Sequence, residues 1–116
     1  MIQKKLILDY ETKIDLIDIE KIVYVTIDST NTVIHLITGS KYSTNKTLTF
    51  FENYAPDIFF KINRNTIVNL SYIISINKLT RKIIIEDDVV LCVSSRQLRL
   101  LAKHLKPILI RSKGNN

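Results

Sequence analysis

A chain of 116 residues, 46% of them hydrophobic, is long enough for one domain with a hydrophobic core and too short for two ordinary domains. Its 17 lysines and arginines outnumber its 11 aspartates and glutamates, and the formal net charge of +6 favours a polyanionic partner such as nucleic acid. The sequence has two glycines and no serine or cysteine in a nucleophile motif, so we expect neither a phosphate-cradling glycine loop nor an enzyme.

The first half of the chain contains short runs rich in isoleucine and valine, separated by polar turns, a pattern typical of an antiparallel meander. The predicted strands are residues 4–10, 13–17, 22–27, 32–37 and 41–43. From Thr47 to Tyr54 the spacing of apolar residues becomes helical, and Pro56 stops this short helix. Thr44 is the candidate for its N-terminal cap.

The segment 59–70 contains two further extended pieces, which are joined by Asn63, Arg64, Asn65 and Thr66. Arginine and asparagine are the side chains that pair bidentately with base edges, so this connection is typical of a surface that reads nucleic acid. Asn69 lies between two apolar residues, and we expect its amide to bond to nearby backbone.

The second half continues with predicted strands at residues 72–76, 82–86 and 89–93 and ends in a helix. The segment Ser94-Ser95-Arg96-Gln97 has the spacing of a capping box. An apolar stripe follows it at helical spacing, formed by Leu98, Leu101, Ala102, Leu105 and Leu109. Pro107 ends or kinks the helix. We therefore predict a single domain over residues 1–110 and a frayed tail over residues 111–116.

The sequence indicates a cytoplasmic protein. It has no secretory signal, because Asp9 and Glu11 interrupt the first apolar run, and no segment approaches the roughly 18 apolar residues of a membrane span. The single cysteine, Cys92, lies in an apolar run, where we expect a buried free thiol.

No group of residues indicates a metal or another cofactor. Asp87 and Asp88 are adjacent carboxylates in a predicted hairpin turn without further ligands near them in the sequence. His35 and His104 have no partner at ligand spacing, so we expect packing or surface roles for both.

The segment 59–70, Tyr72 and Ile73 after it, and Ser94-Ser95-Arg96 before the last helix together resemble the LytTR DNA-binding domain of bacterial transcription regulators. The resemblance covers nearly the whole chain. It implies a mainly β fold, an elongated stack of short antiparallel sheets with short helices on the flank. It also implies that loops enter successive major grooves of a bent duplex, without a recognition helix.

The resemblance implies base contacts from three loops, and it places candidates for phosphate contacts near them. The base-contact candidates are Asn31, Thr32, Asn63, Arg64, Asn65, Ser95 and Arg96. The phosphate-contact candidates are Lys41, Tyr42, Lys46, Lys61 and Arg99. Asn63 and Asn65 differ from the residues usual in the family at these places, so the target sequence can differ as well. Plainer interpretations stay open: Arg64 as a solvated turn residue and Asn31 as a simple turn former.

The expected function is sequence-specific binding of double-stranded DNA, with tandem repeated sites, by the effector domain of a two-component response regulator. The isolated domain is expected to be a monomer off DNA. An N-terminal receiver or sensor domain is the expected partner within a longer protein, although a stand-alone regulator stays open.

The alternative is a basic β-rich protein-interaction or RNA-binding module without sequence-specific DNA readout. RNA readers stack unpaired bases on exposed aromatic side chains. Several tyrosines exposed on one basic face would favour single-stranded nucleic acid; the candidates are Tyr24, Tyr42, Tyr54 and Tyr72.

Overall fold

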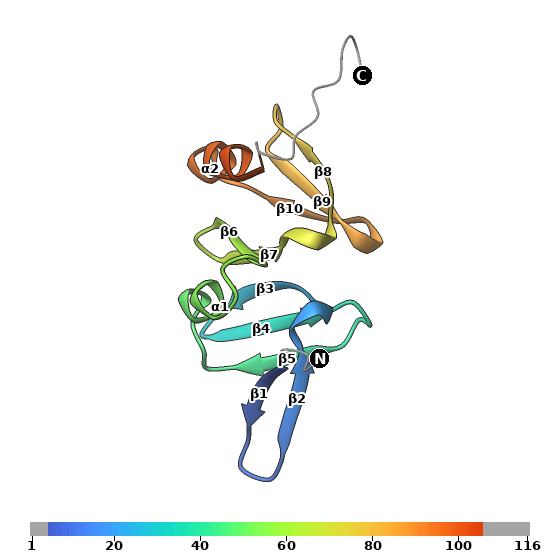
Figure 1. Ribbon diagram of the computed structural model, residues 1–116, viewed down its shortest axis with the longest axis vertical. Helices are drawn as coiled ribbons and strands as arrows, with labels where there is room; N and C mark the ends of the chain where they lie inside the picture. The colour runs from blue at the N-terminus through green and yellow to red at the C-terminus, as the bar shows by residue number, and fades with distance from the viewer. Residues whose placement is uncertain (1–4, 106–116) are drawn as a thin grey trace.

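The computed structural model describes residues 5–105, and the sheets are stacked along a long axis of 57 Å (Figure 1). The predicted tail 111–116, the stripe residue Leu109 and the helix-ending Pro107 lie outside the described residues. Figure 1 shows a hairpin at one end, a larger sheet with one helix in the middle, and a third sheet with the second helix at the other end. The predicted elongated, mainly β fold is confirmed.

Three antiparallel sheets make up the stack: a hairpin of β1 and β2, a five-stranded sheet in the order β5-β4-β3-β7-β6, and a three-stranded sheet in the order β10-β9-β8. The strands are β1 (Lys5–Asp9), β2 (Ile14–Asp18), β3 (Ile22–Asp28), β4 (Asn31–Leu36), β5 (Lys41–Thr44), β6 (Phe59–Asn63), β7 (Thr66–Asn69), β8 (Ile73–Asn77), β9 (Lys82–Ile85) and β10 (Val89–Cys92). The helices are α1 (Leu48–Tyr54) and α2 (Ser95–Leu105), and short 3₁₀ turns lie at η1 (Ile19–Lys21), η2 (Leu70–Tyr72) and η3 (Glu86–Asp88).

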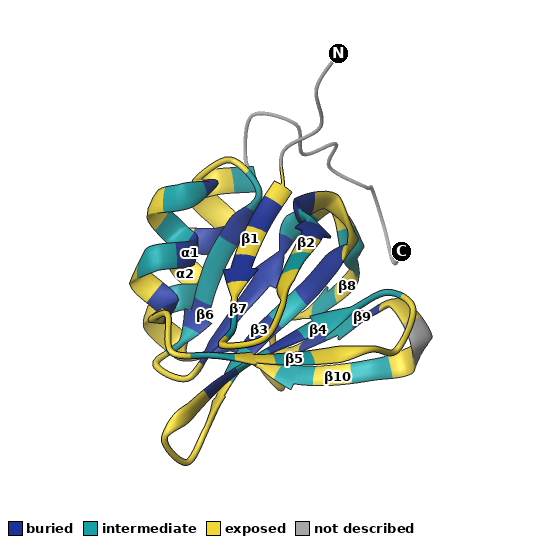
Figure 2. Ribbon diagram, turned by 90° about the horizontal axis from the view of Figure 1, so that it is seen from below, coloured by how far each residue is buried: buried dark blue, intermediate teal, exposed yellow. Residues whose placement is uncertain are grey.

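The five-stranded sheet is covered on both faces, so the stack has two cores. Neighbouring residues of a strand point to opposite faces, and on β7 Ile67 enters the first core while Val68 enters the second. The first core includes Phe51 of α1, and the second includes Leu101 of α2, both fully buried. Buried residues accordingly lie inside the stack, and exposed residues follow its outer loops (Figure 2). Both helices lie on the same side of the molecule in the two views.

The helix ends agree only in part with the predicted caps. Thr47, not Thr44, caps α1: the Thr47 hydroxyl accepts from the N–H of Phe50 at 3.1 Å, and the Thr44 hydroxyl accepts from the N–H of Lys46. The sequence has a threonine at both positions. Only the backbone conformation, which starts the helix at Leu48, shows which of the two is the cap. The predicted Ser94 cap of α2 is confirmed, since its hydroxyl accepts from the N–H of Gln97 at 3.2 Å.

Two burial predictions are wrong. Cys92 is exposed, because burial alternates along β10 and Val89 and Leu91 are the residues that face the core. Ala102 was assigned to the apolar stripe of α2, but it is exposed. The contact between α2 and the sheets is narrower than the apolar stripe, and it is made by Leu98, Leu101 and Leu105.

The side chain of Asn69 joins β7 to the start of β3 from inside the protein. It is 1% exposed, its Nδ2 donates to the carbonyl of Ile22 at 2.9 Å, and its Oδ1 accepts from the N–H of Ser71 at 2.9 Å. The prediction of a structural amide is confirmed. Because the Ile22 carbonyl is buried and the bond to Ser71 is partly buried, these hydrogen bonds matter more than those of a surface amide.

We expect Asn69→Ala to lower the free energy of unfolding by about 1–3 kcal/mol, because it leaves two backbone groups without their partner. Urea unfolding followed by circular dichroism measures the change. The exposed Asn45 supplies the control, and Asn45→Ala should change the free energy by less than about 0.5 kcal/mol. Equal effects of the two substitutions would contradict the role assigned to Asn69.

His35 lies in the five-stranded sheet, where its ring stacks on Tyr24 at 4.0 Å between centroids and its Nε2 lies 3.0 Å from the Thr26 hydroxyl. The expected packing role is thereby confirmed. Burial lowers the pKa of His35 below its ordinary value, and the nearby Lys41 ammonium lowers it further. The folded protein therefore favours the neutral ring.

A lowered pKa makes the unfolded chain bind a proton on His35 more readily than the folded protein does. The contribution of His35 to the free energy of unfolding is therefore fully present above the ordinary pKa of 6.5. It falls as the pH drops below that value. Urea unfolding between about pH 8 and pH 5.5 should show this fall in the wild type and a smaller one in His35→Gln. His104→Gln, on the exposed part of α2, is the control, and it should keep the wild-type fall. Identical pH dependence in all three proteins would refute the assignment.

Candidate nucleic-acid interface

The antiparallel register brings the three predicted loops to one edge of the stack. At the end of β3, Asp28 pairs with Asn31 of β4. The neighbouring N–H of Ile27 donates to the carbonyl of Asn65 in the β6–β7 turn at 3.0 Å. On the other side of this turn, the N–H of Ser94 donates to the carbonyl of Ile62 at 3.0 Å, which places the start of α2 beside it. Backbone hydrogen bonds therefore connect all three loops.

The β6–β7 turn presents Arg64 and Asn65 to solvent. Asn63 holds this turn: its Nδ2 donates to the carbonyl of Cys92 at 2.7 Å, and its Oδ1 accepts from the N–H of Asn65 at 2.8 Å. Within the described part of the chain, the side chains of Arg64 and Asn65 have no hydrogen bond or ion pair of their own. The amide of Asn63 is engaged with backbone at both ends, while the two residues after it are available for a partner.

Hydrogen bonds also hold the start of α2 in place. Gln97 does not complete the capping box by bonding to Ser94; its Nε2 donates to the carbonyl of Lys61 on β6 at 2.5 Å. Ser95 and Arg96 are exposed on the first turn. A cation there is disfavoured by the helix dipole by a few tenths of a kcal/mol, which is consistent with an anionic partner nearby.

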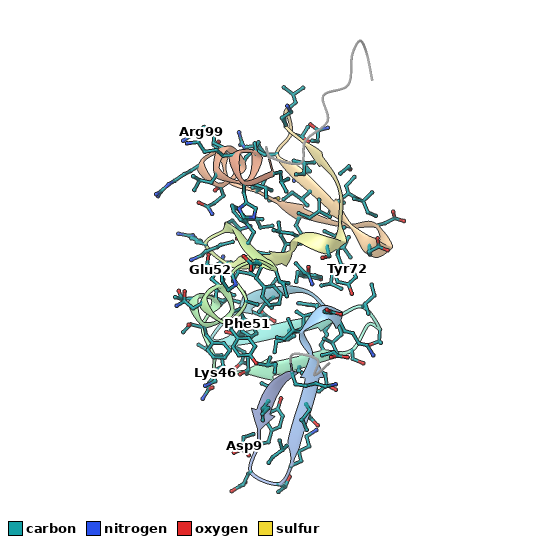
Figure 3. The ribbon with its side chains drawn as sticks, in the orientation of Figure 1. Asp9, Lys46, Phe51, Glu52, Tyr72 and Arg99 are labelled. Carbon is teal, nitrogen blue, oxygen red and sulfur yellow. The ribbon has the colours of Figure 1, made fainter. Side chains whose placement is uncertain are left out.

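The β3–β4 loop contributes Asn31, which is exposed, whereas Thr32 is only 6% exposed and faces the interior. Asn31 shares a groove of about 570 Å³ with Lys46, which follows β5. The Lys46 ammonium lies 5.0 Å from the centre of the Phe50 ring. Figure 3 shows Lys46 and Arg99 pointing outward on the side of the molecule that carries both helices.

The remaining phosphate-contact candidates are less well placed. The register of β4 and β5 pairs Lys41 with His35 and Thr44 with Thr32. Lys41 is thus about 10 Å along the strand from the loop edge. Tyr42 is half-buried against the first core, and Lys61 is half-buried on β6. The structure therefore brings Lys46 to the edge and leaves Lys41 away from it.

The same edge contains basic residues that are not among the predicted contacts. A groove of about 730 Å³ is lined by the β6–β7 turn, the start of α2 and the end of the β8–β9 hairpin, where Thr80, Arg81 and Lys82 lie. The adjacent basic pair was visible in the sequence. Its position was not, because it depends on the pairing of Lys82 with Cys92 across β9 and β10.

The described residues do not form an aromatic platform for unpaired bases. Tyr54 and Tyr72 are half-buried and donate their hydroxyls to the backbone carbonyls of Lys5 and Glu20, each at 2.6 Å. Tyr24 is stacked on His35. The exposed tyrosines that would favour single-stranded nucleic acid are thus not found on residues 5–105.

Two further searches concern the described residues alone. Over residues 5–105, no group of three or more histidine, cysteine, aspartate or glutamate side chains could hold a metal ion. In the same part of the chain, neither helix has the length and hydropathy needed to cross a membrane.

The fold and this edge define a class of protein: a stack of short antiparallel sheets that presents basic and amide side chains on loops. Comparison with families gives a match over residues 12–106 to the LytTr DNA-binding domain. The chain therefore belongs to the LytTr DNA-binding domain family.

A solved structure supports the fold. The LytTr DNA-binding domain of a protein named as a methyl-accepting/DNA response regulator from Bacillus cereus superimposes with a TM-score of 0.76 at 20% sequence identity. The match covers 87% of this chain and 95% of that one. Comparison with curated protein sequences finds no match.

We expect Asn63→Ala to loosen the β6–β7 turn, because it removes two hydrogen bonds to backbone, each contributing about 1 kcal/mol. Hydrogen exchange should show faster exchange of the Asn65 N–H, and urea unfolding should show a lower free energy of unfolding. Asn65→Ala is the matched control, since the Asn65 side chain makes no such bonds. Unchanged exchange in Asn63→Ala would show that the amide does not hold the turn.

Proposed function

We propose that this chain binds double-stranded DNA sequence-specifically through its loop edge, with loops entering successive major grooves. Membership of the LytTr DNA-binding domain family supports DNA as the partner. The observation that carries the finer proposal is the β6–β7 turn, where the bonded amide of Asn63 presents the free side chains of Arg64 and Asn65. Rigid presentation reduces the entropy lost on binding.

The proposed base contacts divide by chemistry. Arg64 and Arg96 are suited to guanine, because the two donors of a guanidinium match the two acceptors of guanine in the major groove. Asn65 and Asn31 are suited to adenine, because the donor and acceptor of an amide match the acceptor and donor of adenine. The Ser95 hydroxyl can contact either type of base.

Asn63 and Thr32 support their loops from behind in this proposal, since one is bonded to backbone and the other is buried. The exposed Lys46 and Arg99 contact phosphates, which position the domain without reading sequence, and the half-buried Lys61 is the weaker candidate.

We further propose that the domain is the effector part of a two-component response regulator in the cytoplasm, without enzymatic activity of its own. The Bacillus cereus protein that shares the fold is named as a response regulator, which supports a regulatory partner such as an N-terminal receiver or sensor domain. Tandem repeated sites and a monomer off DNA complete the proposal. Where a receiver domain joins two copies, the second copy binds its site intramolecularly, so tandem sites gain affinity without any new contact to DNA.

Arg64→Ala and Arg96→Ala should each lower the affinity for the preferred duplex by about 1–3 kcal/mol and relax the preference at one or two base pairs. Lys46→Ala is the comparison: it should weaken binding to all duplexes alike and lower the salt slope by about one. Anisotropy titrations against the preferred duplex, single-base variants and a scrambled duplex measure both effects. An unchanged base preference in Arg64→Ala would remove the central assignment.

A further inference from the structure

The groove beside the β6–β7 turn has three parts that hydrogen bonds hold together. Its floor is the end of β10, where the N–H of Val93 donates to the carbonyl of Arg81 at 3.0 Å. On the opposite side, the carbonyl of Cys92 accepts from Asn63 at 2.7 Å. One wall is thus the start of β9 and the other is the β6–β7 turn.

Among the described residues, those that line this groove carry positive charge and no negative charge. Arg64 rises from one wall, and Arg81 and Lys82 rise from the other. The rest of the lining consists of amides, hydroxyls and two small side chains: Asn63, Asn65, Thr66, Thr80, Ser94, Ser95, Cys92 and Val93. The described lining residues include these three cations and no carboxylate. No negative side chain among them therefore offsets the positive potential of the groove.

The hairpin end is held in a defined shape. The Asn77 Oδ1 accepts from the N–H groups of Leu79 at 3.0 Å and Thr80 at 2.9 Å. Arg81 has a left-handed backbone with φ of 57°, which is uncommon for a residue with a side chain. The Lys82 Nζ lies 3.2 Å from the Cys92 Sγ on the groove floor. The backbone at Arg81 and the ammonium group of Lys82 are therefore held by the protein itself.

The size and the charge of this groove indicate which ligand fits. A groove of about 730 Å³ is too small to admit a whole duplex, but one sugar–phosphate strand at the duplex surface can enter it. Phosphates are the partners of arginine and lysine in most protein–DNA contacts. An unpaired strand would be expected to stack on exposed aromatic side chains, and the groove lining contains none.

We propose that the end of the β8–β9 hairpin is a further DNA-binding element, in which Arg81 and Lys82 hold the phosphates of one strand opposite Arg64. This inference rests on the proposed function, because it assigns a ligand to the same edge. Arg64 reads bases from one wall, and the hairpin fixes the backbone from the other. The hairpin therefore sets the depth to which the β6–β7 turn enters the groove of the duplex.

The test compares the 116-residue wild type with the double variant Arg81→Gln, Lys82→Gln. Anisotropy titrations use the duplex enriched from a random library and its scrambled form at several salt concentrations. Each lost phosphate contact lowers the salt slope by about 0.9, so the double variant should lose a slope of about 1.8 on both duplexes and keep its base preference. Lys78→Gln is the matched control, because Lys78 lies on the same hairpin turn outside the groove lining. It should retain the wild-type slope.

A second measurement needs no variant. Lysine acetylation of the wild-type protein, followed by mass spectrometry, should show Lys82 protected by the enriched duplex and Lys78 still reactive. Equal reactivity of Lys82 with and without duplex would overturn the inference, even if the double variant failed to fold.

The outcomes separate the two proposals. A wild-type salt slope in a folded double variant, while Arg64→Ala loses base preference, would refute the hairpin contact and leave the proposed function standing. Absence of any duplex preference in the wild type would refute the proposed function itself. Protection of Lys82 by single-stranded RNA but not by duplex would overturn the assignment of the groove to duplex DNA.

Discussion

The end of β10 is the place on which the rest of this surface depends. Its backbone is bonded to the β8–β9 hairpin through Arg81, to the side chain of Asn63 through Cys92, and, at Ser94, to the carbonyl of Ile62. A buried or half-buried backbone group must find a partner, and here the partners belong to two different parts of the stack, the β8–β9 hairpin and the end of β6. The loops that carry the free cations are therefore parts of one hydrogen-bonded frame.

This frame supports the proposal that a basic domain of modest size reads sequence. Contacts to phosphate give affinity but no information, whereas base contacts need side chains placed accurately in the groove. Asn63 supplies that placement for Arg64 and Asn65, because its amide bonds to backbone on both sides. The two cores beneath, centred on Phe51 and Leu101, keep the strand ends in register. The residues that hold the edge are thus distinct from the residues proposed to contact DNA.

Much of the fold followed from local patterns in the sequence. Alternating isoleucine and valine predicted the strands, the Ser94 cap predicted the start of α2, and the isolated amide of Asn69 between apolar neighbours predicted a buried hydrogen bond. The burial prediction was wrong where the same run of apolar residues can face the core with either set of alternate side chains. The apolar run around Cys92 does not show which alternate residues face the core, so its exposure could not be read locally.

The candidate site was predicted only as far as its loops. The resemblance to the family pointed to three segments, and the register brings them to one edge. Lys41 and Lys46 look alike in sequence, but only tertiary pairing shows that the strand direction carries Lys41 away from that edge. The proposed role of Arg81 and Lys82 could not be predicted from the sequence for the same reason, since it depends on a strand pairing and not on spacing along the chain.

The most direct test of the central claim is an unbiased selection from a random duplex library with the purified domain at moderate salt. The enriched duplex is then titrated against its scrambled form. The account predicts a repeated motif and an affinity gap of at least about tenfold, or about 1.4 kcal/mol, over the scramble. No enrichment, with weak and equally salt-sensitive binding to every duplex, would contradict it and leave only the general attraction of a basic surface.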